Sequence, residues 1–382
     1  VMTPFISEHR WIRLHGLLVF EDKNPPRINI EETEGVLKRL ARTWEDELLS
    51  ILMGKYQSVL ANQLYRRYQN VFPDAYKENY RPQEAMTDIA FLETLRVDAS
   101  LAVEVSPTEG RTARFKILQW HQQLSLSKVM PILESFGLKV LQEQAFALLH
   151  EENCLWMHDF RTELPDSLSK ENFVQTLAYV REAMQVLWQG GVEADAFNRL
   201  VTVLPCRWRE AHIFRVLSAY LKQVAFPLSA QAQVDALTRY PHIGRSLLEL
   251  FQTRFDPSIN TDRQERQDSV IKRIEMALDK VSSVGDDRVL RELMDVMLAI
   301  VRTNFYMPNA IKQQRISFKI ESEHLRNIPD PKPWREIFVY SPDVMGLHLR
   351  FGAVARGGIR WSDRPEDFRT EESKLIGNNF GV

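Results

Sequence analysis

Cysteine is nearly absent from this chain of 382 residues, which contains only Cys154 and Cys206. Two cysteines cannot build a disulfide framework, so the sequence indicates a reducing compartment such as the cytoplasm. An excess of charge of one sign is also missing, because 49 Lys and Arg stand against 51 Asp and Glu, for a net charge of −2. We therefore expect neither nucleic acid nor an anionic membrane surface as a partner.

Long hydrophobic runs are missing as well. No uninterrupted apolar stretch reaches the ~18 to 20 residues that cross a bilayer, and the first residues lack the charged, apolar and small-residue regions of a secretion signal. The hydrophobic content of 44 % and charged content of 26 % are ordinary for globular chains. This length suffices for two or three domains that each bury a core.

Several motifs of catalysis are absent from the sequence. It contains no Gly-x-Gly-x-x-Gly, no Walker phosphate loop, no His-Glu-x-x-His and no Gly-x-Ser-x-Gly. A nicotinamide enzyme must hold the reactive carbon of its cofactor against the substrate, so we expect no catalytic and no cofactor-binding residues within this chain.

Five side chains that can bind metals stand close together, namely His150, Glu151, Cys154, His158 and Asp159. Their spacing matches no standard zinc pattern, and the two histidines would lie on different strands of a hairpin. We expect ordinary histidines and a buried thiol here, and no metal site.

The pattern of apolar residues predicts an α+β chain with four parts. Residues 1–98 should contain a strand near residues 12–20, one long helix with its apolar face running from Val36 to Leu52, a second helical stripe over 56–68, and a short helix near 83–95. They would be the end of an upstream α+β module with connecting helices. A first strand without a partner indicates that sequence is missing upstream.

Residues 99–162 alternate between apolar and polar side chains. The pattern predicts a hairpin over 101–117, then a helix capped by Ser127 and ended by Gly137, and further strands at 138–149 and 154–160. We interpret this part as a small ferredoxin-like or ACT-like α+β domain.

Residues 163–310 read as helical throughout, with Pro205 and Pro241 in the first turns of following helices. We assign these apolar stripes to core packing. Residues 311–382 return to strands and would be the first strands of an incomplete α/β catalytic domain.

Residues 346–371 combine a strand, a glycine pair, arginines and a helix start. Gly357 and Gly358 let the backbone turn sharply and let a ligand approach closely. Asp363 reads as the cap of a helix whose first amide hydrogens would favour an anion. A guanidinium can grip a carboxylate with two hydrogen bonds, so the run predicts a carboxylate-binding corner. The alternative is an ordinary surface turn before a capped helix.

This run resembles the start of the catalytic domain of the large NAD-dependent glutamate dehydrogenases. The hallmark strings stand here as Val354 to Arg364 and Asp367 to Glu371. Four other strings are similar to the same family and occur in the same order, namely Phe197 to Val201, Arg254 to Pro257, Arg302 to Tyr306 and Ile337 to Pro342.

The resemblance implies oxidative deamination of L-glutamate to 2-oxoglutarate and ammonia, with NAD bound by sequence beyond residue 382. It implies that Arg356 contacts the carboxylate of the substrate while Gly357 and Gly358 allow close backbone approach. Supporting residues would be Arg360, Ser362, Asp363 and Arg364. We expect this segment alone to be inactive and the full-length protein to form a homo-oligomer. Two other hypotheses remain: an ACT-like amino-acid sensor in residues 99–162, and a helical oligomerisation scaffold without catalysis.

Overall fold

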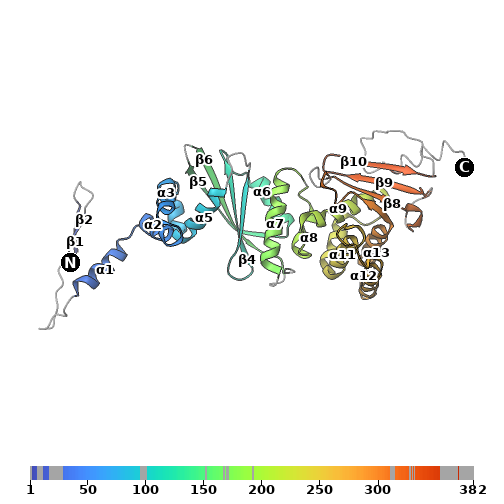
Figure 1. Cartoon of the computed structure of the whole chain (residues 1–382), viewed down its shortest axis with the longest axis horizontal. Helices are drawn as coiled ribbons and strands as arrows, with labels where there is room; N and C mark the ends of the chain where they lie inside the picture. Colours follow the sequence, from blue (N-terminus) through green and yellow to red (C-terminus); the bar gives the residue numbers. More distant parts are fainter. Residues whose placement is uncertain are drawn as a thin grey trace. The chain divides into compact units, whose positions relative to one another are not determined.

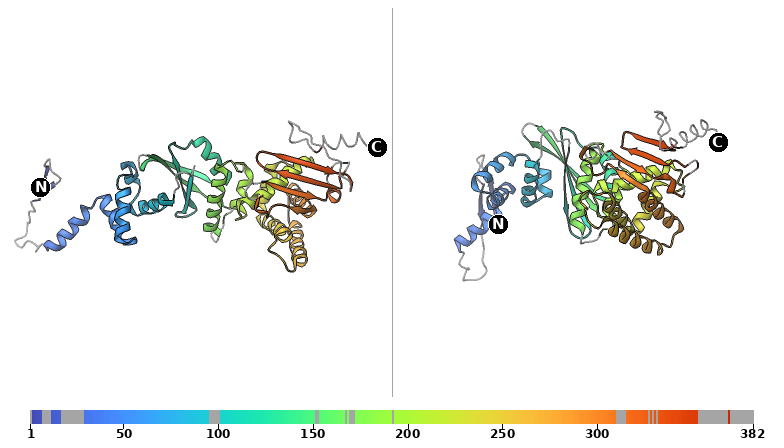
Figure 2. Two further views of the ribbon diagram at one scale, coloured as in Figure 1. Left: turned by 45° about the horizontal axis from the view of Figure 1, so that its top comes forward. Right: turned by 45° about the vertical axis from the view of Figure 1, so that its right-hand side comes forward.

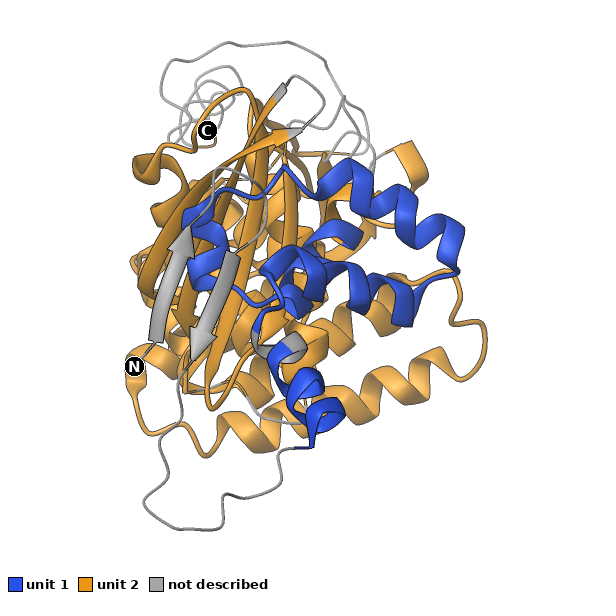
Figure 3. Cartoon of the chain, turned by 90° about the vertical axis from the view of Figure 1, so that its left-hand side faces the viewer, with its two compact units in different colours: residues 1–90 blue, residues 91–382 orange. Residues whose placement is uncertain are grey.

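The computed structural model describes residues 2–6, 12–16, 29–94, 101–150, 153–166, 168, 172–191, 193–309, 315–326, 328, 330, 332–352 and 369. Two compact units contain them, Val1–Ala90 and Phe91–Val382 (Figure 3). The finer division at residues 98, 162 and 310 stays a prediction. None of the helices in the described ranges is long and apolar enough to cross a membrane.

The first unit combines one hairpin with short helices (Figure 1). Strands β1 (Met2–Ile6) and β2 (Ile12–Gly16) pair antiparallel, so the expectation that the strand near residues 12–20 comes first and has no partner is wrong. The helices are α1 (Ile30–Leu40), α2 (Trp44–Lys55), α3 (Ser58–Tyr68), α4 (Asp74–Asn79) and most of α5 (Pro82–Thr94).

The prediction of a single long helix over residues 36–52 is wrong, because the structure has two separate helices here, α1 and α2. Thr43 is the N-cap of α2, and its hydroxyl accepts the Asp46 amide hydrogen at 3.2 Å while its own amide donates to the Asp46 carboxylate at 3.1 Å. This reciprocal capping box satisfies two amides that a new helix leaves unpaired. The apolar period continues across the break, which is why periodicity alone missed it.

A four-stranded antiparallel sheet follows, as the alternation over residues 99–162 predicts. Its strands are β3 (Ala102–Pro107), β4 (Thr112–Trp120), β5 (Lys139–His150) and β6 (Asn153–Glu163), in the order β3-β4-β6-β5. Helix α6 (Leu126–Ser135) connects β4 to β5, and α7 (Phe173–Trp188) packs against β3. This order is a circular permutation of the ferredoxin-like β-α-β-β-α-β arrangement. The helix cap lies at Ser125 and not at Ser127.

His158 lies on β6 and is completely buried. Its Nε2 accepts the backbone amide hydrogen of Leu124 at 3.1 Å, and its Nδ1 lies 2.9 Å from the Glu143 carboxylate. Because Nε2 is an acceptor, the proton of the neutral ring sits on Nδ1 and is donated to Glu143. Burial lowers the pKa of His158.

Helices dominate residues 173–299. After α7 come a short 3-10 turn (Ala196–Asn198) and the helices α8 (Arg199–Val203), α9 (Trp208–Gln223), α10 (Ala230–Arg239), α11 (Pro241–Phe255), α12 (Arg263–Leu278) and α13 (Val284–Ala299). Pro241 occupies the first turn of α11 as predicted, whereas Pro205 lies in the turn before α9.

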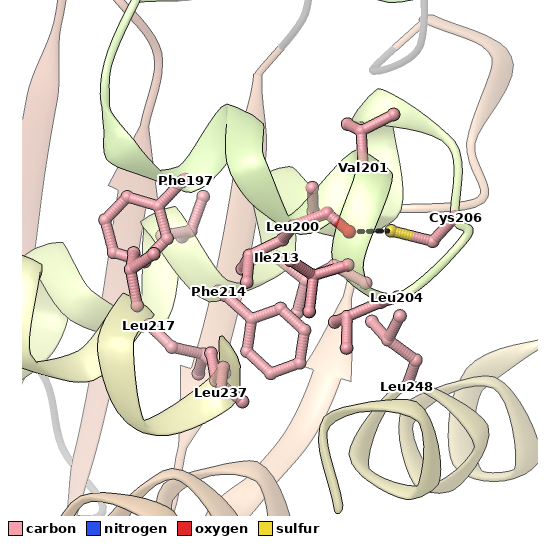
Figure 4. Close-up of a cluster of buried hydrophobic side chains, with 14 of the residues drawn as sticks. Phe197, Leu200, Val201, Leu204, Cys206, Ile213, Phe214, Leu217, Leu237 and Leu248 are labelled. Atoms are coloured by element: carbon pink, nitrogen blue, oxygen red, sulfur yellow. Dashed lines mark hydrogen bonds between the residues drawn. The ribbon is translucent and has the colours of Figure 1, made fainter. Parts of the chain in front are cut away.

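The side chains of these helices share one apolar core with the sheets (Figure 4). Phe214 and Leu217 of α9 meet Leu200 of α8 and Leu237 of α10 there. Cys206 is buried in the same core, and its thiol donates to the Leu200 carbonyl at 3.5 Å. Burial raises the pKa of this thiol well above its ordinary value, so it packs as an apolar group.

A third sheet begins directly after α13. Strand β7 (Ile300–Thr303) pairs with β8 (Ile316–Ile320), and β9 (Arg335–Tyr340) and β10 (Met345–Arg350) extend the sheet in the order β10-β9-β8-β7. The predicted helical character of residues 163–310 is therefore wrong for β7. Helices α9 and α11 cover one face of this sheet (Figure 2), where Tyr220 meets Phe338 and Phe251 meets Phe318.

Three helices end on residues with positive φ. Gly137 after α6 and Gly190 after α7 have φ of 73° to 77°, whereas Ala225 after α9 adopts 58°. At each of these helix ends, the backbone amides that follow the helix donate to carbonyls of its last turn. After α9, for example, the Ala225 amide donates to the Lys222 carbonyl and the Phe226 amide to the Leu221 carbonyl. This is the Schellman motif, which favours glycine because a Cβ atom is strained there.

We predict opposite effects of substitution at these positions. Ala225→Gly should raise the free energy of unfolding by ~0.5 to 1 kcal/mol, and Gly190→Ala should lower it by about 1 to 2 kcal/mol. Gly137→Ala should cost more than Gly190→Ala, because the added Cβ would lie 3.2 Å from Nε of Arg199, whereas the space at Gly190 is open. Urea unfolding of the three variants measures this order. Equal losses at the two glycines would contradict the role of the Arg199 contact.

A second prediction concerns acid stability. The lowered pKa of His158 means that the unfolded chain binds a proton first as the pH falls below about 6.5. The stabilisation is therefore complete above pH ~6.5 and decreases towards the lower folded-state pKa. His158→Gln keeps an acceptor for Leu124, and it should reduce the loss between pH 7.5 and 5.5 by up to about 1.4 kcal/mol. Unfolding midpoints at both pH values test this, and an unchanged pH dependence in the variant would refute it.

Candidate functional site

The predicted carboxylate site lies outside the described residues. This holds for Arg356, Gly357 and Gly358 and for the supporting residues Arg360, Ser362, Asp363 and Arg364. The structure describes the chain up to Gly352 on one side of this segment and Arg369 on the other side. The described residues on either side of this segment are Gly352 and Arg369, and their contacts are given below.

The upstream flank is the β9–β10 pair. Arg350, the last residue of β10, lies opposite Arg335, the first residue of β9, and Leu349 lies opposite Glu336. Arg335 forms an ion pair with Glu321, and its guanidinium stacks on the Trp334 ring at 4.6 Å. The ion pair with Glu321 and the stacking on Trp334 thus hold the first residue of β9 in place.

The downstream flank is Arg369, whose side chain is 2 % exposed. Its Nε and Nη2 atoms each lie 3.2 Å from Oε1 of Glu336, which is completely buried on β9. Its backbone amide donates to Oε1 of Gln223 at 3.2 Å, and the Gln223 amide reaches Sδ of Met345 at 3.6 Å. Two elements, α9 and β9, therefore hold Arg369, and Gln223 of α9 also contacts β10.

The ion pair lies beside Tyr220 of α9 and Ser322. Burial, with the adjacent charge of Glu336, raises the pKa of Tyr220 well above its ordinary value, so the phenol stays neutral. Oη of Tyr220, Oγ of Ser322 and Oε2 of Glu336 are buried without a hydrogen-bond partner among the described residues. These three groups lie around the ion pair, and the neutral phenol adds no charge to it.

A second buried network lies at the other end of β9. Arg215 of α9 donates from Nε and Nη2 to the Asp195 carboxylate, both at 2.7 Å, and from Nη2 to Oδ1 of Asn198 at 2.9 Å. Tyr340 of β9 donates to Glu193 at 2.7 Å. A cavity of about 440 Å³ opens beside Arg215 and Tyr340. The fork-shaped pairing with Asp195 offsets the charge of Arg215, which fits a structural junction better than an anion site.

The strings quoted from the sequence make structural contacts at junctions between elements. Asn198 donates to Oγ of Ser135 at 3.2 Å. Arg254 donates to the Leu298 and Ile300 carbonyls at 2.9 and 2.7 Å, where α13 leaves carbonyls unpaired. The fourth string, Ile337 to Pro342, contains most of β9. These strings place elements and do not converge on one reaction centre.

The structure describes four of the five residues weighed as a metal cluster, since Glu151 lies outside the described residues. His150 lies on β5, His158 is bound to Glu143, and Asp159 forms an ion pair with Arg114 at 3.3 Å. Cys154 pairs with Leu149 in the sheet register. Within the described part of the chain, no three His, Cys, Asp or Glu side chains are arranged to hold a metal ion.

Sequence reasoning missed Glu336, Arg369 and Arg215. A signal for Glu336 was present, because Glu336, Phe338 and Tyr340 alternate along one strand and so face the same side. A glutamate on a face with two aromatic residues requires a cation when that face is buried. Arg369 stood within the quoted string Asp367 to Glu371 but was given no role. Nothing in the local pattern marked Arg215.

Comparison with known proteins identifies four related domains between residues 52 and 378. Residues 52–95 match "Glutamate dehydrogenase, helical motif 2", and residues 80–173 match "Glutamate dehydrogenase, ACT3 domain". Residues 192–257 match "Glutamate dehydrogenase, helical motif 3", and residues 273–378 match "Bacterial NAD-glutamate dehydrogenase, catalytic domain". The ACT3 match contains the β3–β6 sheet and α6.

Three curated relatives are named NAD-specific glutamate dehydrogenase. The protein of Halomonas elongata is 35 % identical over 379 residues, covering 98 % of this chain and 23 % of the relative. Those of Pseudomonas aeruginosa and Mycobacterium tuberculosis are 34 % and 31 % identical, covering 97 % and 98 % of this chain and 24 % of each relative. The chain thus spans about a quarter of the length of these proteins. Four successive domain matches together with these relatives show that the chain belongs, as a segment, to the family of the large NAD-specific glutamate dehydrogenases.

Proposed function

We propose that this chain is part of an enzyme that oxidises L-glutamate with NAD to 2-oxoglutarate and ammonia. The observation that carries the proposal is the match of residues 273–378 to the catalytic domain of bacterial NAD-glutamate dehydrogenase. That match includes the segment in which sequence reasoning located a carboxylate-binding corner. The NAD-specific names of the relatives support the same cofactor.

In this proposal the chain supplies substrate binding. Arg356 would hold a carboxylate of glutamate through two parallel hydrogen bonds. Gly357 and Gly358 would let backbone amides approach the substrate without interference from a Cβ atom. Holding the substrate fixes its α-carbon for the loss of hydride, and such positioning lowers the entropic part of the barrier.

The residues of this chain do not fit a dinucleotide site. The sequence lacks the glycine fingerprint that brings a pyrophosphate to a helix N-terminus, and that contact requires a close backbone approach. NAD supplies a hydride acceptor when bound, and we assign its binding and the catalytic base to sequence outside this chain. We also propose a cytoplasmic homo-oligomer. The sensor role of residues 99–162 stays a second hypothesis, which amino-acid-dependent melting of that sheet would test.

A third prediction is that the purified segment has no NAD-dependent glutamate dehydrogenase activity. The reason is the missing dinucleotide fingerprint together with the missing general base. Absorbance of NADH with glutamate and NAD present measures the rate, and the full-length enzyme at equal concentration is the positive control. Turnover that co-purifies with the segment and disappears on denaturation would refute the prediction.

A fourth prediction concerns Arg356 in the full-length enzyme. Arg356→Ala should lower kcat/KM for glutamate about ten- to 150-fold, because a hydrogen bond to a charged group contributes about 1.5 to 3 kcal/mol. The KM for NAD should change little. Arg356→Lys should recover part of the loss, since it keeps the charge without the fork geometry. Gly358→Val should be worse than either, because a β-branched side chain fills the approach space.

Arg273→Ala is the matched control for this series. Arg273 pairs with Glu249 on an exposed surface of α12, and such pairs contribute about 0 to 1 kcal/mol. Its kinetics should equal those of the unmodified enzyme. An Arg356→Ala enzyme with unchanged kcat/KM for glutamate would exclude Arg356 from the substrate site.

A further inference from the structure

The sheet β10-β9-β8-β7 has one face that is rich in cations. Phe318 and Phe338 lie on the face that α9 and α11 cover, so the residues that alternate with them occupy the opposite face. On that opposite face, Lys319 of β8 lies between Arg302 of β7 and Ile337 of β9. We call it the basic face, and its cations are Arg302, Lys319, Arg335 and Arg350. Within the described strands of this sheet, no acidic residue stands on the basic face.

Arg302 and Lys319 are like charges on neighbouring strands. They lie directly opposite each other in the register, an arrangement that destabilises a sheet. Neither side chain has an ion pair or a hydrogen bond with another residue in the described ranges. Arg335, by contrast, pairs with Glu321, the residue that follows β8. The exposed Arg302 and the half-buried Lys319 are therefore two positive charges that a carboxylate from outside this chain would neutralise.

Apolar side chains accompany these charges. Ile337 and Val339 of β9 lie on the basic face and are half-buried, and Val301, beside Arg302, is 42 % exposed. Apolar side chains bordered by charged groups are the composition of a protein interface. Helices α9 and α11 lie against the other face of the sheet (Figure 2). The basic face therefore has the character of a docking surface for an acidic partner.

We propose that an acidic segment of the full-length polypeptide, from sequence outside this chain, docks on the basic face with its carboxylates against Arg302 and Lys319. This chain covers 23 % and 24 % of two relatives, so the larger part of the full-length polypeptide lies outside it. Single surface ion pairs are weak, and a separate acidic protein would need many of them. A tethered segment has a high effective concentration, so it needs few. This docking surface is independent of the glutamate chemistry of the proposed function.

Cross-linking of the full-length enzyme tests the proposal. A carbodiimide activates a carboxylate, and the Lys319 amine attacks it to form an amide while the carbodiimide leaves as a urea. Such a link forms only between groups in contact. We expect mass spectrometry of the digest to join Lys319 to an Asp or Glu outside residues 1–382. Addition of about 0.5 M NaCl should lower the yield about fivefold, because salt screens exposed charges.

Charge reversal at the same position separates docking from a solvated face. The carboxylate introduced by Lys319→Glu would pair with Arg302 within the sheet, so a solvated face predicts no loosening anywhere. Docking predicts that the same carboxylate repels the acidic segment, and hydrogen exchange in the cross-linked segment should accelerate about tenfold. Lys319→Arg is the matched control, because it keeps the charge, and it should leave exchange unchanged. Lys272→Glu, which reverses an exposed charge on α12, should also leave it unchanged.

The proposal is overturned if Lys319 forms no cross-link, or if its cross-links lead to residues of this chain, as a second copy on this face would give. It is also overturned if Lys319→Glu and Lys319→Arg give the same exchange in the cross-linked segment, or if Lys272→Glu accelerates that exchange equally. Replacement of the cross-linked acidic residue by lysine in the Lys319→Glu enzyme should restore slow exchange, since the two charges would again be opposite. Failure of this swap to slow the exchange would exclude a direct contact between the two positions.

Discussion

One face of strand β9 constrains the arrangement of the second unit. Glu336, Phe338 and Tyr340 alternate along the strand and therefore share that face, where they meet Arg369, the ring of Tyr220 and Glu193 respectively. A slip of one residue in register would place Ile337 and Val339 there and leave the partner charges buried and unpaired. Such a slip costs far more than the loss of packing, so the Glu336–Arg369 ion pair at one end of β9 and the Tyr340–Glu193 hydrogen bond at the other end fix the register of this strand.

Arginine side chains also fix the positions of elements in the helical part of the chain. Arg254 binds the carbonyls at the end of α13, and Arg263 binds the Thr253 and Asp256 carbonyls at 2.9 and 2.7 Å after α11. Arg209 donates to the Phe305 carbonyl at 2.6 Å and covers its ring at 4.6 Å. A helix end leaves four carbonyls without partners, and a guanidinium offers five donors in one plane. The contacts of Arg254 and Arg209 connect α11 and α9 to β7 and the following loop, whereas those of Arg263 connect α12 to the end of α11.

Local pattern predicted much of the secondary structure, because each pattern has one dominant physical cause. The alternation of apolar and polar residues predicted strands β3 to β6 and β8 to β10, and Gly137 predicted the end of α6. The failures occurred where two causes compete. The capping box at Thr43 interrupts a continuous apolar stripe, and β7 follows α13 while apolar residues continue through both. The buried pair of Glu336 and Arg369 could not be derived, since it joins residues 33 positions apart and only the tertiary fold brings them together.

The family strings divide into two physical kinds. Three of those before residue 343 contain side chains that bind other parts of the fold or form β9, as Asn198 and Arg254 illustrate. The string from Val354 to Arg364 has a different composition, with a glycine pair and three arginines in eleven positions. Among the described arginines, those buried in the fold have partners in the protein, as Arg215, Arg254 and Arg369 illustrate. Substrate binding is therefore assigned, in the proposed function, to this string and not to the strings that build the fold.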